Sequence, residues 1–135
     1  MDTKTFFQGN IFKIVAKHSG KVLDIPGAQK LEDHVKLMQW DDLGGDNQKF
    51  LIFPMDDVGK YFVIATLASG KVLDMPNSSN AESMFVIQHY WHGGDNQLFE
   101  LEAVSNDPNN DTFYIRSKAS GKILGVADLR YVLPP

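Results

Sequence analysis

The sequence predicts an all-β protein with the β-trefoil fold, because one segment occurs three times at a spacing near 50 residues. The copies are SGKVLDIPG at 19–27, SGKVLDMPN at 69–77 and the more divergent SGKILGVAD at 120–128. Their serines are 50 and 51 residues apart in a chain of 135 residues. A small unit of short strands cannot bury its apolar face alone, whereas three such units around an axis can. A blade array would need more units, and a two-sheet sandwich gives no reason for a threefold repeat.

The first strand of each unit is expected just before its Ser-Gly pair. In FKIVAKHSGK, FVIATLASGK and FYIRSKASGK, large apolar residues alternate with other residues until the Ser-Gly turn. This alternation predicts a strand with one buried face that runs into a hairpin. KVLD and KILG are then the returning strands. The residues expected in the core are the Phe seven positions before each Ser and the Ile two positions after that Phe: Phe12, Phe62, Phe113, Ile14, Ile64 and Ile115.

Two further strands are expected in each of the first two units. VKLMQW (35–40) and FVIQHY (85–90) are interpreted as third strands, and QKFLIF (48–53) and QLFELE (97–102) as fourth strands. No segment shows a sustained helical period. The chain is therefore expected to be a single β-trefoil domain over 1–135.

The third unit is incomplete in this scheme. The repeats are expected at about 10–58, 59–108 and 109–135, and the last has only LRYVLPP (129–135) as a possible third strand and nothing for a fourth. We propose that the N-terminal segment TKTFF (3–7) fills the vacant place. The alternatives are a shortened unit, or one completed by a second copy of the chain through swapping, so homo-oligomerisation stays open.

Composition excludes several kinds of site and partner. The formal net charge is -4 with a pI near 5.4, so nucleic acid and anionic lipid are not expected as partners. The chain has no Cys, which rules out disulfides and thiolate metal sites. The start, MDTKTFFQGNIF, lacks the pattern of a secretory signal, and no apolar run is long enough for membrane insertion. We therefore expect a cytoplasmic protein, or one released by a non-standard route.

A second repeated signal follows the first two hairpins. WDDLGGDNQKF (40–50) and YWHGGDNQLF (90–99) share the core Gly-Gly-Asp-Asn-Gln. The spacing from Asp24 to Trp40 is the same as that from Asp74 to Tyr90. Each unit thus carries an Asp, an aromatic residue and an Asn-Gln pair. A carboxylate and an amide suit the hydroxyls of a neutral sugar, and a flat ring covers its apolar face.

These motifs resemble the ricin-type β-trefoil lectin family, although Phe50 and Phe99 stand where the family motif has Trp. The resemblance implies a non-enzymatic lectin, or agglutinin, that binds galactose or N-acetylgalactosamine without a cofactor or metal. The implied partners are glycans and glycoproteins. The first implied pocket contains Asp24, Trp40, Asn47 and Gln48, and the second contains Asp74, Gln88, Tyr90, Asn96 and Gln97.

The two implied pockets differ in their neighbours. Met38 stands two residues before Trp40, where the second pocket has Gln88. His89, Trp91 and His92 adjoin the second pocket in the sequence and could extend it toward a second sugar.

The third unit lacks every polar residue of this pattern. Gly125 occupies the position of Asp24 and Asp74, and no aromatic or Asn-Gln follows. The sequence therefore predicts two pockets rather than three. Each Asp could alternatively cap a turn, and each aromatic could belong to the core. Two other functions stay open: a protein-interaction trefoil, such as a protease inhibitor or cytokine-like protein, and a sugar-targeting module of a toxin or enzyme complex.

No catalytic constellation is present in the sequence. The four histidines do not have metal-ligand spacing. There is no nucleophile elbow, phosphate loop or Cys-His arrangement, and the acidic stretch NDPNND (106–111) does not follow a calcium-loop pattern. The protein is therefore not expected to be an enzyme.

Overall fold

The computed structural model describes residues 10–27, 31–76, 86–104 and 111–131, and these residues form strands and two short 3-10 helices. The all-β prediction is confirmed. No helix in the described residues is long and apolar enough to cross a membrane. In chain order the elements are β1 (Ile11–Ala16), β2 (Val22–Asp24), β3 (Val35–Lys36), β4 (Met38–Trp40), η2 (Asp46–Gln48), β5 (Phe50–Pro54), β6 (Phe62–Thr66), β7 (Val72–Asp74), β8 (Ile87–His89), η4 (Asp95–Gln97), β9 (Phe99–Ala103), β10 (Thr112–Ser117) and β11 (Ile123–Tyr131).

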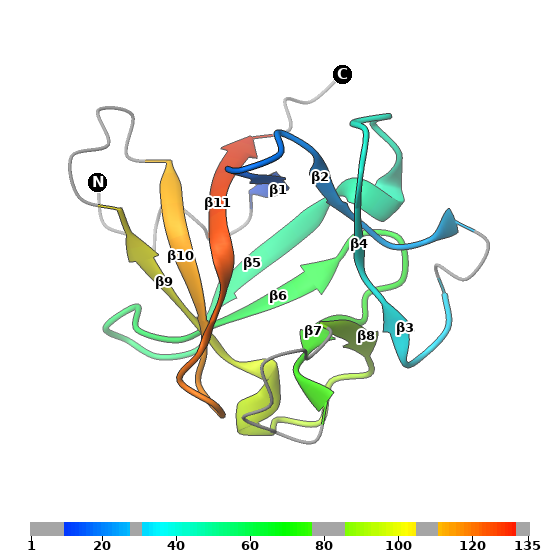
Figure 1. The fold of residues 1–135 in the computed structure, drawn as a ribbon. Coiled ribbons are helices and arrows are strands. Elements are labelled where there is room, and N and C mark those ends of the chain that lie inside the picture. Colours follow the sequence, from blue (N-terminus) through cyan, green and yellow to red (C-terminus); the bar gives the residue numbers. More distant parts are fainter. Residues whose placement is uncertain (1–9, 28–30, 77–85, 105–110, 132–135) are drawn as a thin grey trace.

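The long strands form a closed barrel. Each long strand pairs antiparallel with the next in the order β1, β5, β6, β9, β10, β11. The ring closes because β11 also pairs with β1. The short hairpins attach to this ring: β2 pairs with β1 and β4, and β7 pairs with β6 and β8 (Figure 1). A barrel with hairpins contributed by repeated units is the predicted β-trefoil, and that prediction is confirmed.

The barrel interior is filled by equivalent residues of the three repeats. All of the predicted core positions are buried, together with one Phe from each of β5 and β9. Full burial of a large apolar side chain stabilises a fold by roughly 1.5–3 kcal/mol, so this cluster is a major source of stability. Its central members are Phe12, Ile14, Phe50, Phe62, Ile64, Phe99, Phe113 and Ile115.

The third repeat is closed by β11. The strand β5 bridges β1 and β6, β9 bridges β6 and β10, and β11 likewise bridges β10 and β1. The returning strand of the third hairpin thus continues into the place of a fourth strand. The sequence interpretation of 129–135 as a separate third strand was wrong for Leu129–Tyr131, which belong to β11. The segment 3–7, proposed for the vacant place, lies outside the described residues.

The first repeat reaches across to the second. The sequence predicted one strand over 35–40, but the chain divides it between two partners. The pair Val35–Lys36 hydrogen-bonds to β8 of the second repeat, whereas Met38–Trp40 pairs with β2 of its own repeat. Between them, Leu37 N donates to the backbone oxygen of Val86 at 3.0 Å. This crossing brings the loop before β3 beside the second hairpin.

Candidate functional site

The first site is a carboxylate held by two amides. Asp24 ends β2 and is only 3% exposed. Asn47 Nδ2 donates to its Oδ1 at 3.3 Å, and Gln48 Nε2 donates to its Oδ2 at 2.7 Å. The 3-10 turn η2 presents both amides, and Ile25 N donates to the backbone oxygen of Asn47 at 3.0 Å, which ties the turn to the end of β2.

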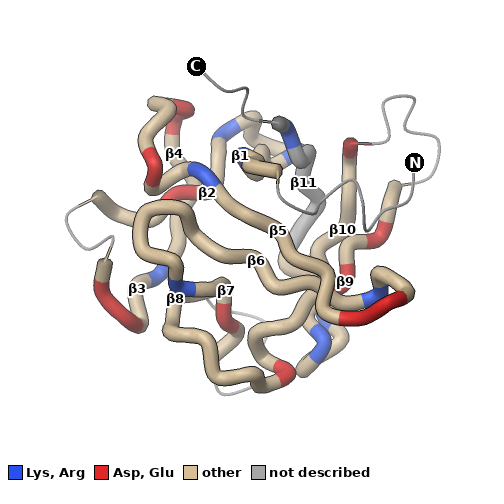
Figure 2. Tube along the Cα trace, turned by 180° about the vertical axis from the view of Figure 1, so that it is seen from behind, with Lys and Arg blue, Asp and Glu red and all other residues tan. Residues whose placement is uncertain are grey.

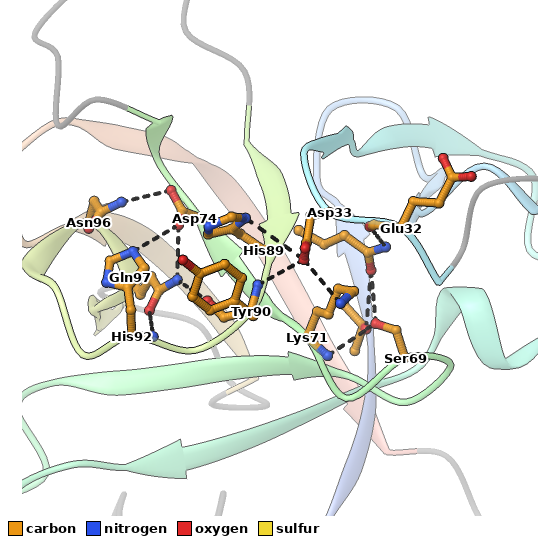
Figure 3. A network of polar contacts seen from close by, with 12 residues as sticks. Glu32, Asp33, Ser69, Lys71, Asp74, His89, Tyr90, His92, Asn96 and Gln97 are labelled. Carbon is orange, nitrogen blue, oxygen red and sulfur yellow. Dashed lines mark hydrogen bonds and ion pairs between the residues drawn. The ribbon is translucent and has the colours of Figure 1, made fainter.

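The second site repeats this geometry around Asp74. The carboxylate, at the end of β7, is 2% exposed. Asn96 Nδ2 donates to Oδ1 at 2.8 Å and Gln97 Nε2 donates to Oδ2 at 2.9 Å (Figure 3). The turn η4 is fastened in the same way, because Met75 N donates to the backbone oxygen of Asn96 at 2.8 Å. The structure therefore brings the predicted Asp, Asn and Gln together in both repeats.

The two Gln side chains are braces within these sites. Gln48 Oε1 accepts from the backbone N–H groups of Leu43 and Gly44, and Nε2 donates to the backbone oxygen of Asp41 as well as to Asp24. Gln97 makes the corresponding contacts in the second repeat. An ionised carboxylate offers about four acceptor positions, and the amides use two of them. Each Asp thus retains acceptor capacity for hydroxyl donors.

Glycines shape the loop beside each Asn. A Cβ on Gly45 would lie 2.6 Å from Asn47 Oδ1, and a Cβ on Gly94 would lie 2.6 Å from Asn96 Oδ1. Both distances are shorter than side-chain contacts allow, so only glycine leaves room for the amide. The geometry of the turn therefore explains the second glycine of each Gly-Gly-Asp-Asn-Gln sequence, Gly45 and Gly94.

The strand register shows that Trp40 and Tyr90, the aromatic residues predicted for the two pockets, are not at equivalent positions. Trp40 lies opposite Val22, and in the second repeat the residue opposite Val72 is His89. Tyr90 instead corresponds to Asp41, since the backbone oxygen of each accepts from the Gln amide at 2.8 Å. The equal spacing of Trp40 and Tyr90 from their Asp residues in the sequence was misleading. Trp40 is 51% exposed and Tyr90 is 55% exposed, so neither ring belongs to the core.

Gln88 does not join the second site, contrary to the sequence prediction. Its side chain is fully buried, its Oε1 accepts from Ser69 Oγ at 3.0 Å, and its Nε2 donates to the backbone oxygen of Glu32. The equivalent of Gln88 in the first repeat is Gln39, whose Oε1 accepts from Ser19 Oγ at 2.6 Å. These two Gln side chains fasten the Ser-Gly hairpins.

The surroundings of the two sites differ in charge. Beside Trp40, Asp41 pairs with Lys21 at 2.8 Å and Asp42 pairs with Lys13 at 2.7 Å. The hydrogen bond from Lys13 holds the pKa of the Asp42 carboxyl below its ordinary value. Figure 2 shows these acidic and basic segments next to one another at β2 and β4.

The second site is surrounded by rings instead. The rings of His89 and Tyr90 are 4.1 Å apart, and the ring of His92 lies 6.1 Å from that of Tyr90, with its Nε2 3.7 Å from Asp74 Oδ2. The sequence had identified His89 and His92 as neighbours of this site, together with the exposed Trp91.

In the described part of the third repeat, a glycine stands at the position of the two carboxylates. Gly125 lies within β11, opposite Ile115 of β10. Among the residues that the structure describes, no group of three or more His, Asp or Glu side chains is arranged to hold a metal ion.

Comparison with protein families identifies the repeated pattern. The sequence matches the family described as ricin-type beta-trefoil lectin domain-like over residues 5–88 and again over 46–129. The chain belongs to this ricin-type lectin family. Membership supports carbohydrate binding as its general activity. A search of curated protein sequences found no match.

Solved structures similar to this ricin-type chain include trefoils alone and within larger proteins. ThreeFoil, a designed threefold symmetric protein, is 29% identical with a TM-score of 0.75, and the match covers 93% of this chain and 90% of that one. An exo-β-1,3-galactanase from Clostridium thermocellum is 25% identical with a TM-score of 0.73, covering 93% of this chain and 28% of the galactanase. A Polyporus squamosus lectin, solved with Neu5Acα2-6Galβ1-4GlcNAc, is 19% identical with a TM-score of 0.71, covering 96% and 46%. The last likeness shows the fold alone.

Sequence reasoning missed two residues of the first repeat that lie beside the second ricin-type site. Asp33 Oδ1 accepts from Tyr90 N at 3.1 Å, and the His34 ring lies 4.4 Å from that of His89. Neither residue belongs to a repeated motif, so no sequence pattern pointed to them. Their position follows from the crossing of the first repeat onto β8.

Proposed function

We propose that the protein is a non-enzymatic lectin with two sugar-binding sites, centred on Asp24 and Asp74, for galactose- or N-acetylgalactosamine-type glycans. The observation that carries this proposal is the repeated geometry of a buried carboxylate held by one Asn and one Gln. Scaffold needs alone would apply equally to the third repeat, which has Gly125 instead.

The chemistry of each site fits a neutral sugar. Two vicinal hydroxyls can donate to the remaining acceptor positions of one carboxylate, and such charge-assisted hydrogen bonds are about twice as strong as neutral ones. The exposed rings of Trp40 at the first site and of Tyr90 at the second offer faces for the C–H surface of a pyranose.

Two sites on one domain would raise the strength of attachment to a multivalent target. A shallow sugar site binds with a dissociation constant on the order of millimolar to high micromolar. Simultaneous engagement of two terminal sugars on a glycoprotein or cell surface would increase avidity without new contacts. This gives the duplicated geometry a functional reason.

The choice of galactosides rests on family likeness. Galactose-type ligands are the commonest preference implied by the ricin-type motifs, and one structurally similar trefoil belongs to an enzyme named as a galactanase. The alternative is that the domain directs an enzyme or toxin to a sugar surface. Similar trefoils within a galactanase and a mosquitocidal holotoxin support that alternative, since they form 28% and 16% of those chains.

A glycan array with five variants tests the proposal: two single variants of the central carboxylates, the double variant that combines them, and two controls. Asp24→Ala and Asp74→Ala remove the central carboxylates. Asp46→Ala and Asp95→Ala are matched controls, because these carboxylates lie in the same turns but pair with Lys49 and Lys118.

We expect binding to terminal galactosides by the unaltered chain, a weaker signal from each central variant, none from the double variant, and an unchanged signal from both controls. Each central variant leaves buried amide donors unpaired, which costs about 1–3 kcal/mol of stability. Circular dichroism therefore has to show that the variants are still folded. An array without signal from the folded, unaltered chain would refute the lectin proposal and favour a protein partner.

A further inference from the structure

The second site is built from two repeats. The loop before β3 lies along β8, where His34 N donates to the backbone oxygen of Gln88 at 2.9 Å and Val35 pairs with Gln88 in the sheet. Gln88 returns a hydrogen bond from its side chain to the backbone oxygen of Glu32. Asp33, the residue after Glu32, therefore stands beside Tyr90 in space, although 57 residues separate the two in the sequence (Figure 3).

Asp33 is the charged centre of this contact. Its Oδ1 accepts from Tyr90 N at 3.1 Å and lies 3.0 Å from Lys71 Nζ. His89 Nδ1, a buried atom without a hydrogen-bond partner, faces the same oxygen at 3.8 Å. The hydrogen bond from Lys71 is the main reason why the pKa of the Asp33 carboxyl lies below its ordinary value.

Comparison of the repeats shows what Asp33 replaces. In the first repeat, hairpin residue Lys21 pairs with Asp41, the acid that follows Trp40. The second repeat has Tyr90 at the position of Asp41, so the equivalent Lys71 lacks that acid in its own repeat. Asp33 of the first repeat supplies a carboxylate instead, and the position of Asp41 becomes available for an aromatic ring.

The same loop also contacts the histidine ring of the site. His34 has a positive φ of 64°, which is uncommon for a residue other than glycine. This conformation places its ring 4.4 Å from the ring of His89, which also lies 4.1 Å from the ring of Tyr90. The His89 ring is therefore in contact with a ring from the first repeat and a ring from its own.

We propose that Asp33 is a positioning residue for the second sugar site, acting across the boundary between the repeats. It fixes the Tyr90 backbone and the Lys71 ammonium group, and thereby orients the rings of His89 and Tyr90 beside Asp74. The proposal deepens the proposed function and rests on it. A residue outside the repeated motif then orients the rings of the second site, whereas the contacts described for the first site join residues of the first repeat.

Nuclear magnetic resonance of the intact chain tests this with one reporter for each site. The side-chain amides of Asn47 and Asn96 donate to the two central carboxylates and report galactose binding separately. Asp33→Ala removes the carboxylate, and Asp33→Asn retains an oxygen that can accept from Tyr90 N. Asp41→Ala is the matched control, since it removes the lysine-paired acid of the first repeat.

For Asp33→Ala we expect a shifted Tyr90 amide signal, shifted His89 and Tyr90 ring signals, and an unchanged Trp40 indole signal. The galactose dissociation constant reported by Asn96 should rise about 2- to 10-fold, the range for loss of one hydrogen bond, while that reported by Asn47 stays the same. Asp33→Asn should restore part of this affinity, and Asp41→Ala should leave Asn96 unaffected.

Equal weakening at both reporters, or an unchanged constant at Asn96, would overturn the positioning role. If the unaltered chain shows no galactose-dependent shift at either reporter, the proposed galactoside function fails instead. The ring signals then decide about Asp33 by themselves: unchanged His89 and Tyr90 rings in Asp33→Ala refute its role, and shifted rings support it.

Discussion

Gln97 donates from Nε2 to the backbone oxygen of Tyr90 at 2.8 Å, as Gln48 does to the backbone oxygen of Asp41. This pair of contacts aligns the two repeats independently of the sequence. It places His89, rather than Tyr90, at the position of Trp40. The two sites therefore share their polar part and differ in their aromatic part, and variants can separate the two contributions.

Replacement of Trp40 should weaken the first site without destabilising the fold. The ring is 51% exposed, and an aromatic contact contributes about 0.5–1.5 kcal/mol. We therefore expect Trp40→Ala to raise the galactose dissociation constant at the first site several-fold, with the melting temperature unchanged. Isothermal titration and thermal unfolding measure the two quantities. Leu43→Ala, an exposed apolar residue in the following loop, is the control. Equal losses in both variants would contradict a specific role for Trp40.

Replacement of Gln88 should mainly destabilise the fold. Gln88→Ala removes a fully buried side chain that accepts from Ser69 Oγ and donates to the Glu32 backbone oxygen, two partly buried hydrogen bonds. We expect a loss of about 1–3 kcal/mol in the free energy of unfolding, measured by urea denaturation, an unchanged galactose affinity at the first site, and at the second site no more than the loss expected for Asp33→Ala, because the loop that carries Asp33 loses its bond to Gln88. An affinity loss without a loss of stability would restore Gln88 to the site.

The features that could be predicted from the sequence are those that recur in the repeats. Phe12, Phe62 and Phe113 were predictable as core because the barrel repeats its packing three times. The Asp, Asn and Gln of each site were predictable because they recur together. The aromatic alignment failed because the first repeat has one more position between its Asp and Gln39 than the second has between its Asp and Gln88. Contacts between different repeats, such as that of Asp33, leave no periodic signal.

Alanine in place of Gly45 should remove sugar binding at the first site, because its Cβ displaces the Asn47 amide. A Cβ on Gly45 would lie 2.6 Å from Asn47 Oδ1, so the side chain must leave Asp24 or the turn must move. We expect Gly45→Ala to abolish the response of the Asn47 amide to galactose and to leave that of Asn96 intact. Gly27→Ala is the control, since its Cβ would meet no atom within 4 Å. A first site that still binds in Gly45→Ala would show that the Asn geometry is not required.

The ionised carboxylate of Asp56 should stabilise the fold, and this stabilisation should be lost at low pH. Its carboxylate accepts from the backbone N–H groups of Val58, Lys60 and Tyr61, and the bonds to Lys60 and Tyr61 contribute most to a pKa below the ordinary value of 3.8. Because the folded state lowers this pKa, the contribution is fully present above about pH 4 and is lost as the pH falls through the lowered pKa. Asp56→Asn should therefore be less stable than the unaltered chain at pH 6 in urea unfolding, and the difference should shrink as the pH falls below 3.8. Asp46→Asn serves as the exposed control. A stability difference for Asp56→Asn that is constant between pH 6 and pH 3 would show that the turn does not depend on the ionised carboxylate.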